Sequence, residues 1–341
     1  MTNELTPILM VGSIPLADEG DVFRTCAQFL GDRIRAIPDG ETGARTNWIN
    51  WQKDVMERTA MLQRNTHSDG YGAVQVDLYD LRPDYPGPRE FPPLGYAEAA
   101  IASYATFDRL VREGLVDPHA RMQVSLPTPF APMMAFVAPM AFAEVEPLYL
   151  QAMQRELQAI LAVIPVEKLA VQWDVALEFA AIEGVFPSPV GDFESLTDRL
   201  VELAGWLPDN VPMGFHLCYG DADHKHFKEP ADTKLMAQVI ERLVAGSRRR
   251  IDWFHLPVPI NRDDDSYFAP LSGLTLDAQA RLYLGLVHLH DGIDGAMRRA
   301  ATARRHVERF GIATECGLGR RPRSSVVQIL ELQAQIARAL D

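Results

Sequence analysis

LAVQWD (169–174), FESLTDRLVELAGWL (193–207) and VPMGFHLC (211–218) follow one another along the chain and decide the fold class. The first and third runs are short and apolar on both faces, which is typical of strands buried in a parallel sheet. The middle run has apolar residues spaced at i, i+3, i+4 and i+7, which predicts an amphipathic helix. Two such strands joined by a helix form the repeating unit of α/β proteins.

The same alternation extends along the whole chain. Strand-like runs occur at residues 7–13, 34–38, 121–126, 169–174, 211–218, 251–257, 282–290 and 311–316. Helix-like runs lie between or after them, at residues 17–30, 97–114, 144–164, 193–207, 232–247, 296–310 and 324–340. Eight strands alternating with helices favour a (β/α)₈ TIM barrel that forms a single domain over residues 1–341. A doubly wound open sheet is the alternative, but no glycine-rich phosphate turn follows the first strand.

Residues 63–95 interrupt this alternation after the second strand. The segment is rich in Pro, Gly, Asp and Tyr and predicts a long excursion, with a short hairpin around GAVQVDLYDL (72–81). Long loops of compact domains are frequently lids or binding loops. A decorative insertion is an equal alternative.

Composition narrows the classes of partner. The chain has 33 Lys and Arg against 46 Asp and Glu, a net charge of −13, which disfavours nucleic acids and anionic membranes. No window approaches 18 uninterrupted apolar residues, so we expect no membrane span, and the N-terminal sequence has no signal-peptide pattern. Three cysteines are a small and odd number, which argues against a disulfide framework and favours a cytoplasmic protein. We expect its partners to be small molecules. A homo-oligomer remains open.

Polar residues gather at one end of the predicted strands. Active-site residues of a barrel follow the carboxyl ends of its strands. Those ends carry Ser13, Asp39 to Glu41, Thr128, Asp174, His216, Cys218, His255, His290, Glu315 and Cys316. Nearly every strand therefore ends in a side chain that can ionise, ligate or hydrogen-bond, which predicts a functional site at this end.

His216 and Cys218 are two residues apart on one strand and so share a face. His255 ends the sixth strand and Cys316 the eighth, so four nitrogen and sulfur donors could converge. Such donors suit Zn²⁺ better than Mg²⁺ or Ca²⁺. The alternative is a core histidine beside a buried thiol, and the residues alone leave the two interpretations even.

Other ionisable residues have less distinctive surroundings. Glu41 and Asp174 lie on the opposite wall and could hold a cationic group, although Glu41 could equally sit at a helix N-terminus. His290, on the same face of the seventh strand as His288 and nearer the mouth, is a candidate proton carrier. His224 and His226 lie on a charged loop, which predicts that they are solvated. Trp48, Trp51 and Trp173 fill the core or form an aromatic pocket wall.

An ordered set of motifs resembles a known family. The motifs are VGSIP (11–15), DGETGARTNW (39–48), VQWDVAL (171–177), HLC (216–218), VHLHDG (287–292) and ATECGLGRR (313–321). Together they resemble the C-terminal catalytic barrel of cobalamin-independent methionine synthase and its single-barrel relatives. These relatives include archaeal methyltransferases and epoxyalkane:coenzyme M transferase, within the superfamily of uroporphyrinogen decarboxylase.

The resemblance implies a zinc-dependent alkyl or methyl transferase that activates a thiol as a zinc-bound thiolate. It implies zinc ligation by His216, Cys218 and Cys316, with His255 at the place of the family's glutamate ligand. It also implies contacts from Glu41 and Asp174 to a substrate amino group, from Ser13 to a carboxylate, and a proton-managing role for His290. Two departures leave the thiol and the alkyl donor unassigned, because Asp174 lacks a following Glu-Pro and residues 125–137 lack a tryptophan for folate stacking.

Two further functional hypotheses remain open. The same barrel could host a metal-dependent or metal-free lyase or decarboxylase acting on a small carboxylated or aromatic compound, with Trp48, Trp51, Tyr71 and Tyr79 at its entrance. It could also serve as a ligand-binding protein or a partner subunit without enzymatic activity.

Overall fold

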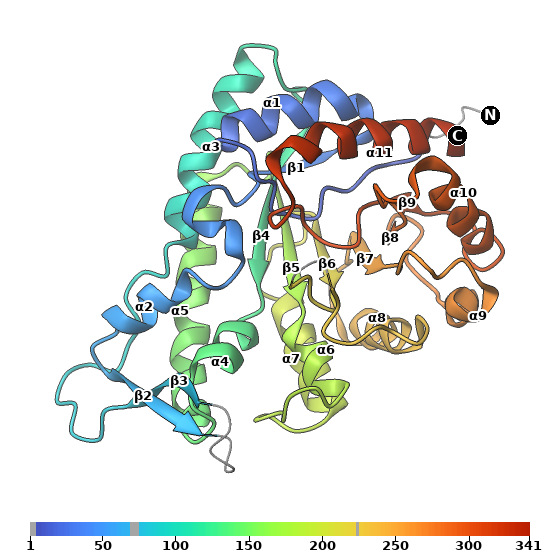
Figure 1. The fold of residues 1–341 in the computed structure, drawn as a ribbon. Helices are drawn as coiled ribbons and strands as arrows, with labels where there is room; N and C mark the ends of the chain where they lie inside the picture. Colours follow the sequence, from blue (N-terminus) through green and yellow to red (C-terminus); the bar gives the residue numbers. More distant parts are fainter. Residues whose placement is uncertain (1–4, 69–74, 223–224) are drawn as a thin grey trace.

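Seven parallel strands form one sheet in the part of the chain that the structure describes, residues 5–68, 75–222 and 225–341 of a computed structural model. The sheet curls, and the helices lie on its outer side (Figure 1). Its spatial order follows the chain: β1 (Ala36–Pro38), β4 (Arg121–Pro127), β5 (Leu169–Val175), β6 (Met213–Leu217), β7 (Trp253–Pro257), β8 (Arg281–Gly285) and β9 (Gly311–Ile312).

Helices connect successive strands and pack their apolar faces on the sheet. Asp18 caps α1 by accepting a hydrogen bond from the backbone N–H of Asp21 at 2.8 Å, and Asp192 caps α7 in the same way through Ser195 at 3.1 Å. The α-helices are α1 (Glu19–Leu30), α2 (Gln52–Arg58), α3 (Tyr96–Arg112), α4 (Phe130–Phe136), α5 (Phe142–Val163), α6 (Leu177–Ile182), α7 (Phe193–Ala204), α8 (Lys234–Gly246), α9 (Asp265–Phe268), α10 (Gly292–Ala303) and α11 (Val326–Leu340). Short 3₁₀ helices span Gly31–Arg33, Gly43–Asn47, Ala269–Gly273 and Arg323–Ser325.

The predicted first strand, residues 7–13, forms only one isolated bridge, from Ile8 to Ile312. The segment is nevertheless tied on both sides, because the N–H of Leu9 donates to the carbonyl of Ile312 at 3.0 Å and the N–H of Ile8 donates to that of Arg33 at 2.8 Å. The α/β class and a curled parallel sheet are therefore confirmed. The strand pairing does not establish a fully closed eight-stranded barrel.

The concave side of the sheet contains a small hydrophobic core of its own. Its buried members come from segment 7–14, β5, β7 and the residue after β9: Leu9, Val11, Ala170, Trp253 and Ala313. We call this group the inner cluster. It is separate from the larger core between the sheet and the helices. The inner cluster fills the middle of the curled sheet, so any cavity on the concave side must lie at one end of the strands or the other.

The seventh predicted strand, residues 282–290, is shorter than expected. β8 ends at Gly285, because the N–H of Leu286 turns back to the carbonyl of Leu284 at 2.8 Å. The carbonyl of Leu286 is then held by the buried guanidinium of Arg299 at 3.0 Å. His288 and His290 consequently follow the strand instead of sharing its face.

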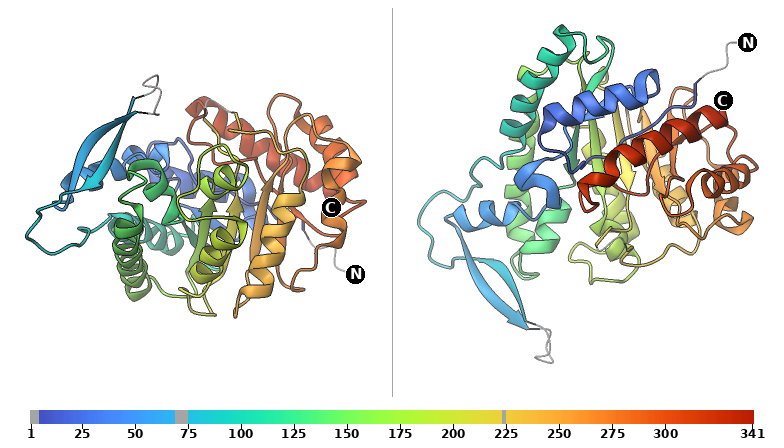
Figure 2. Two further views of the ribbon diagram at one scale, coloured as in Figure 1. Left: turned by 90° about the horizontal axis from the view of Figure 1, so that it is seen from below. Right: turned by 45° about the horizontal axis from the view of Figure 1, so that its top comes forward.

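Residues 62–68 and 75–81 form an antiparallel pair of strands that projects from the body of the protein (Figures 1 and 2). β2 (Leu62–Ser68) pairs antiparallel with β3 (Gln75–Leu81), and the predicted residues 72–74 of this hairpin lie outside the described residues. Its exposed side chains pair with one another, as Asn65 does with Asp80 at 2.7 Å.

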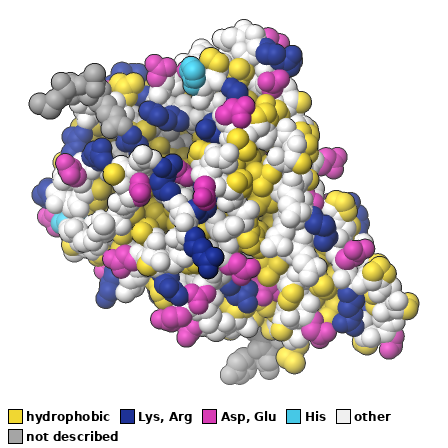
Figure 3. Space-filling model, turned by 180° about the vertical axis from the view of Figure 1, so that it is seen from behind, with side chains coloured by type: hydrophobic (Ala, Val, Ile, Leu, Met, Phe, Trp, Pro, Cys, Tyr) yellow, Lys and Arg dark blue, Asp and Glu magenta, His cyan; other side chains and the backbone are white. Residues whose placement is uncertain are grey.

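The surface carries charges of both signs. On the face shown in Figure 3, basic side chains are scattered among acidic ones, with apolar side chains in a band between them. No helix in the described ranges is long and apolar enough to cross a membrane.

Candidate functional site

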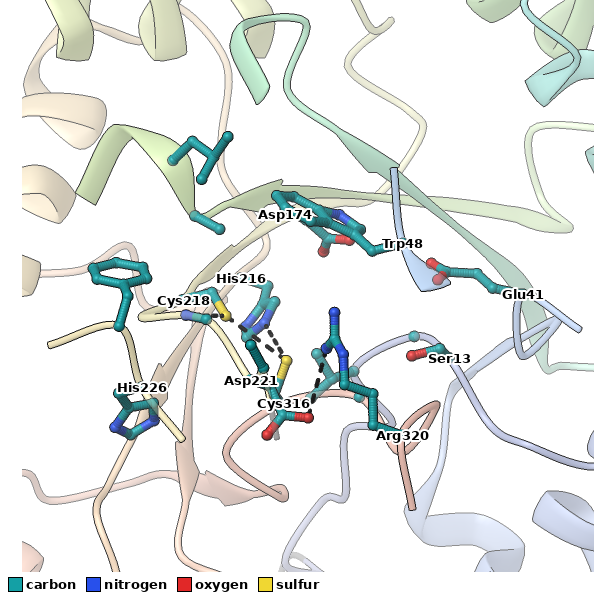
Figure 4. A pocket seen from close by; sticks show the side chains of 18 of the residues that line it. Ser13, Glu41, Trp48, Asp174, His216, Cys218, Asp221, His226, Cys316 and Arg320 are labelled. Carbon is teal, nitrogen blue, oxygen red and sulfur yellow. Dashed lines mark hydrogen bonds and ion pairs between the residues drawn. The ribbon is translucent and has the colours of Figure 1, made fainter. Parts of the chain in front are cut away.

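A cavity of about 300 Å³ lies at the carboxyl ends of the strands. Six of the predicted site residues line it: Ser13, Glu41, Asp174, His216, Cys218 and Cys316. Figure 4 shows the two cysteines and His216 pointing toward one another, with Glu41 and Ser13 across the cavity. The parallel sheet explains this convergence, because the carboxyl ends of parallel strands meet at one edge.

Three donor atoms form a compact group that we call the soft triad: His216 Nε2, Cys218 Sγ and Cys316 Sγ. All three lie within 4.8 Å of one another. Cys316 Sγ is 3.7 Å from Cys218 Sγ and 3.7 Å from His216 Nε2. Zn–S bonds of roughly 2.3 Å and Zn–N bonds of roughly 2.05 Å at tetrahedral angles require separations of roughly 3.8 Å between sulfurs and roughly 3.6 Å between sulfur and nitrogen. Both separations from Cys316 Sγ therefore match those of a zinc tetrahedron, and the third lies within 4.8 Å.

His255 lies behind His216, and both of its ring nitrogens are hydrogen-bonded within the protein. Its Nε2 is 3.0 Å from the carbonyl of Thr314, and its Nδ1 is 2.7 Å from Nδ1 of His216. Because a carbonyl only accepts, His255 Nε2 carries the proton, and Nδ1 of the neutral ring accepts from His216. The Nε2 atom of His216 then keeps its lone pair free on the side of the cysteines. The predicted ligand His255 is not a member of the soft triad and does not line the cavity.

The protonation states agree with this arrangement. Burial lowers the pKa of His216 well below its ordinary value, and the neighbouring His255 lowers it further. Burial lowers the pKa of His255 to about 3, although its hydrogen bond to Thr314 opposes this shift. Both imidazoles are therefore neutral at physiological pH, the form in which histidine ligates metals. The hydrogen bond to Cys218, together with burial, raises the pKa of the Cys316 thiol well above its usual range.

Glu41 reaches the cavity from a strained turn after β1. Asp39 builds this turn, since its carboxylate accepts hydrogen bonds from the N–H of Glu41 at 2.9 Å, from Arg45 at 2.8 Å and from Ser103 at 2.8 Å. Glu41 has a positive φ of 48°, which is unusual for a residue other than glycine. Non-glycine residues in such conformations cost roughly 1–3 kcal/mol and cluster at functional sites.

Asp174 forms the second acidic group of the cavity. It pairs in register with His216, which in turn pairs with His255, so these three residues form one row across β5, β6 and β7. Gln172 donates to Asp174 Oδ1 at 2.9 Å. Burial raises the pKa of Asp174 to about 7, and it raises the pKa of Glu41 well above its ordinary value, with a further contribution from the charge of Asp174. Both carboxyl groups thus hold protons at pH values where exposed carboxyls are ionised.

The segment that follows β9 packs directly on Ser13. The N–H of Leu318 donates to the carbonyl of Ser13 at 2.6 Å, and the N–H of Gly319 donates to its hydroxyl at 3.3 Å. A Cβ atom on Gly317 or Gly319 would lie 2.5 or 2.8 Å from Ser13 Oγ, so both positions require glycine. This close approach brings Arg320 to the cavity.

Arg320, Asp221 and His226 also line the cavity, although none of them was predicted to belong to the site. Arg320 lies in the ECGLGRR motif, and its Nη1 is 3.7 Å from the carboxylate of Asp221. Asp221 comes from the end of the GFHLCYGD stretch (214–221), so both positions follow a strand end, the signal that located the other site residues. His226, which was predicted to be solvated, instead lines the cavity with Nε2 3.7 Å from Glu315 Oε1. His224 lies outside the described residues.

The remaining predicted residues lie elsewhere. His290 is exposed and is not among the residues that line the cavity, while His288 is buried with its Nε2 2.9 Å from the carbonyl of Val258. Trp48 lines the cavity, whereas Trp51 packs on Tyr96 and the fully buried Trp173 packs on Trp206. Tyr79 is buried in the hairpin, and Tyr71 lies outside the described residues.

Solved structures share this fold. No family model and no curated protein matches the sequence. The structure of a B12-independent methionine synthase from Shewanella sp. W3-18-1 in complex with selenomethionine matches with a TM-score of 0.57 and 13% identity, over 99% of this chain and 98% of that one. A methyltransferase from Methanosarcina mazei matches with a TM-score of 0.55 and 12% identity, over 97% and 94% of the two chains. At such low identity these likenesses show a common fold.

Proposed function

We propose that this protein is a zinc-dependent alkyltransferase, and specifically that it transfers an alkyl group, such as methyl, to the sulfur of a small thiol. The soft triad carries the proposal, because the two separations from Cys316 Sγ, to Cys218 Sγ and to His216 Nε2, agree with a zinc tetrahedron to within roughly 0.1 Å. The fold shared with a methionine synthase and a methyltransferase supports it. In the same proposal, segment 7–14 completes the curled sheet as the eighth member of a barrel.

His216, Cys218 and Cys316 would hold the metal, and the fourth position would remain for a substrate sulfur. Bound zinc lowers the pKa of a thiol ligand, so that the sulfur is an ionised nucleophile at neutral pH. All three residues line the cavity.

His255 acts in this proposal as a positioning residue instead of a fourth ligand. Its two hydrogen bonds, to Thr314 and to His216, hold His216 in the tautomer that leaves Nε2 free. Such outer partners typically contribute 10–100-fold to metal affinity. Histidine in place of the family's glutamate thus changes the number of protein ligands from four to three.

The other wall of the cavity would hold the polar part of the thiol. Glu41 and Asp174 offer two carboxyl groups to a cation, and Arg320 with Ser13 offers donors to an anion. An ammonium group between the two carboxyls would favour their ionised forms and lower their raised pKa values. The cavity therefore suits a thiol with both a positive and a negative group better than an uncharged thiol.

The reaction must balance protons as well as the alkyl group. The carbon–leaving group bond breaks as the sulfur–carbon bond forms, the thiol proton is lost, and the leaving group gains a proton. His290 was the predicted acid, but it is exposed. We assign the final proton transfer to His226, which lines the cavity and is oriented by Glu229 at 3.1 Å from its Nδ1.

One observation favours a second candidate, a lyase or decarboxylase acting on a small carboxylated compound. Asp174 is buried, Glu41 is partly buried, and the pKa values of both carboxyl groups are raised, so the pair suits general acid–base chemistry near neutral pH. This function would not require a thiol.

Metal analysis combined with thiol binding tests the proposal. We expect about one zinc per purified chain, and we expect the sulfur-to-metal charge-transfer absorption of the cobalt-substituted protein, already present from its two cysteines, to increase with homocysteine or 2-mercaptoethanesulfonate. Homocysteine carries an ammonium group, whereas 2-mercaptoethanesulfonate does not. A response to homocysteine alone would therefore indicate that the two carboxyl groups bind the ammonium group. Protein that binds neither zinc nor cobalt would refute the proposal, and protein that binds metal without any response to either thiol would favour the lyase.

A further inference from the structure

A second cavity of about 300 Å³ lies at the amino ends of the strands, and we call it the basal cavity. It lies on the other side of the inner cluster from the candidate site. Leu9, Ala170 and Trp253 belong both to the inner cluster and to the lining of the basal cavity. Its volume falls at the lower end of the range of small-molecule sites, roughly 300–1,000 Å³.

Three guanidinium groups surround this cavity. Arg35 precedes β1, and Arg121 and Arg281 are the first residues of β4 and β8. Asp252 is the carboxylate among the described lining residues, and it already accepts hydrogen bonds from the N–H of Met213 and from Arg250 Nε, both at 2.9 Å. The basal cavity is thus electropositive in a chain with a net charge of −13, and it attracts anions.

The wall of the basal cavity is aromatic. The indole of Trp253 is 7% exposed, and it occupies space left by Gly214, where a Cβ atom would lie 2.2 Å from the ring. The phenol of Tyr283 lies beside it in the same lining. Burial raises the pKa of Tyr283 to about 12, and the charges of Arg281 and Arg35 oppose this shift, so both guanidiniums act on the phenol.

We propose that the basal cavity binds a small organic anion with a planar apolar body, of the class of aromatic carboxylates. Its carboxylate would pair with Arg281 and Arg35, and its ring would pack on Trp253 and Tyr283. Guanidinium groups recognise carboxylates through paired hydrogen bonds. The aromatic wall can pack on the ring of an organic anion, whereas an inorganic anion has no apolar surface for this contact. This inference is independent of the zinc-dependent reaction, because its residues are separate from those of the soft triad.

Titration calorimetry with benzoate as the probe tests this inference on the wild-type protein. We expect saturable binding of one benzoate per chain, with at least tenfold weaker binding of benzyl alcohol, which has the ring without the charge. Acetate, which has the charge without the ring, should also bind at least tenfold more weakly.

Three variants identify the cavity that is used. Arg281→Gln and Arg35→Gln should each weaken benzoate binding at least fivefold. Arg320→Gln is the matched control, since it removes a guanidinium from the cavity at the opposite end of the strands. Thermal unfolding should show that each variant is folded. Because Arg35 is exposed, Arg35→Gln keeps the test valid if Arg281→Gln is unstable.

Three results would overturn the inference. The first is equal binding of benzoate and benzyl alcohol. The second is weaker benzoate binding by Arg320→Gln together with unchanged benzoate binding by folded Arg281→Gln and Arg35→Gln. The third is an absence of saturable benzoate binding to the wild-type protein.

Discussion

His216 and His255 occupy paired positions of neighbouring parallel strands, and their Nδ1 atoms lie 2.7 Å apart. Because His255 is also bonded to the carbonyl of Thr314, the direction of each hydrogen bond is determined. The backbone carbonyl that follows β9 thereby sets which nitrogen of His216 faces the two cysteines.

Replacement of His255 tests this chain of hydrogen bonds. We expect His255→Leu to weaken zinc binding by about 10–100-fold, since His216 would lose its fixed tautomer. His255→Gln should retain affinity within a few-fold, because its amide can donate toward Thr314 and accept from His216. Zinc competition and the absorption spectrum of the cobalt-substituted protein measure both effects. Equal affinities in these two variants would contradict the positioning role, whereas an absence of zinc in the wild-type protein would refute the metal site itself.

Removal of one thiol tests the soft triad directly. Cys316→Ser should lower bound zinc from about one per chain to a small fraction, because a hydroxyl is a much poorer zinc ligand than a thiolate. Cys26→Ala is the matched control, since Cys26 is a buried thiol of α1 outside the cavity. Elemental analysis after dialysis checks both variants. Stoichiometric zinc in folded Cys316→Ser would show that this cysteine is not a ligand.

The raised pKa of Asp174 predicts a pH-dependent stability. The folded state holds a proton on Asp174 up to about pH 7, whereas the unfolded chain releases it near pH 4. Protonated Asp174 therefore contributes its full stabilisation of the folded state below about pH 4. This stabilisation decreases as the pH rises from about 4 to about 7. We expect Asp174→Asn to gain stability relative to the wild type over this window, by on the order of a few kcal/mol. Urea unfolding at pH 4 and pH 7.5 measures the difference.

Glu178 provides a matched control for Asp174. Burial also raises the pKa of Glu178 to about 7, with an opposing hydrogen bond from Thr128, but Glu178 does not line the candidate site. Glu178→Gln should show a similar trend in stability while leaving thiol binding unchanged. Asp174→Asn should show the trend and also weaken binding of a cationic thiol. Loss of thiol binding in both variants would mean that the effect is structural.

The packing of Trp253 on Gly214 predicts a large effect from one methyl group. Gly214→Ala should destabilise the protein by about 1–3 kcal/mol or more, because a Cβ atom would overlap the indole at 2.2 Å. Gly273→Ala, where a Cβ atom has no neighbour within 4 Å, should change stability little. Urea unfolding compares the two, and adding Trp253→Leu should relieve the strain of Gly214→Ala. Equal costs of Gly214→Ala in the presence and absence of the indole would contradict this contact.

The sequence allowed prediction of the elements that are buried on both faces. β6 and β7 lie within the predicted runs, β5 extends its run by one residue to Val175, and the period of two brought His216 and Cys218 toward one cavity. The relation between His216 and His255 was not predictable, because the register between two strands depends on packing that a single sequence does not contain.

Two histidines were misjudged for identifiable physical reasons. The apolar run around His290 continues past Gly285, but the turn at Leu286 ends the strand. His226 has charged neighbours in the sequence, but its loop folds back so that the N–H of Phe227 donates to the carbonyl of Tyr219 at 2.8 Å. Local amino-acid composition does not predict that a loop folds back in this way.

Trp253 also lies between the two cavities as a natural optical reporter. Its indole nitrogen is 3.4 Å from Gln172 Oε1, and the amide nitrogen of Gln172 is 2.9 Å from the carboxyl of Asp174. An indole's emission responds to the polarity and hydrogen bonding around it, and this indole touches one cavity directly and the other through a single side chain. The chain has five tryptophans, so the difference in emission between the wild-type protein and a Trp253→Leu variant can record occupancy at either end of the strands without any label.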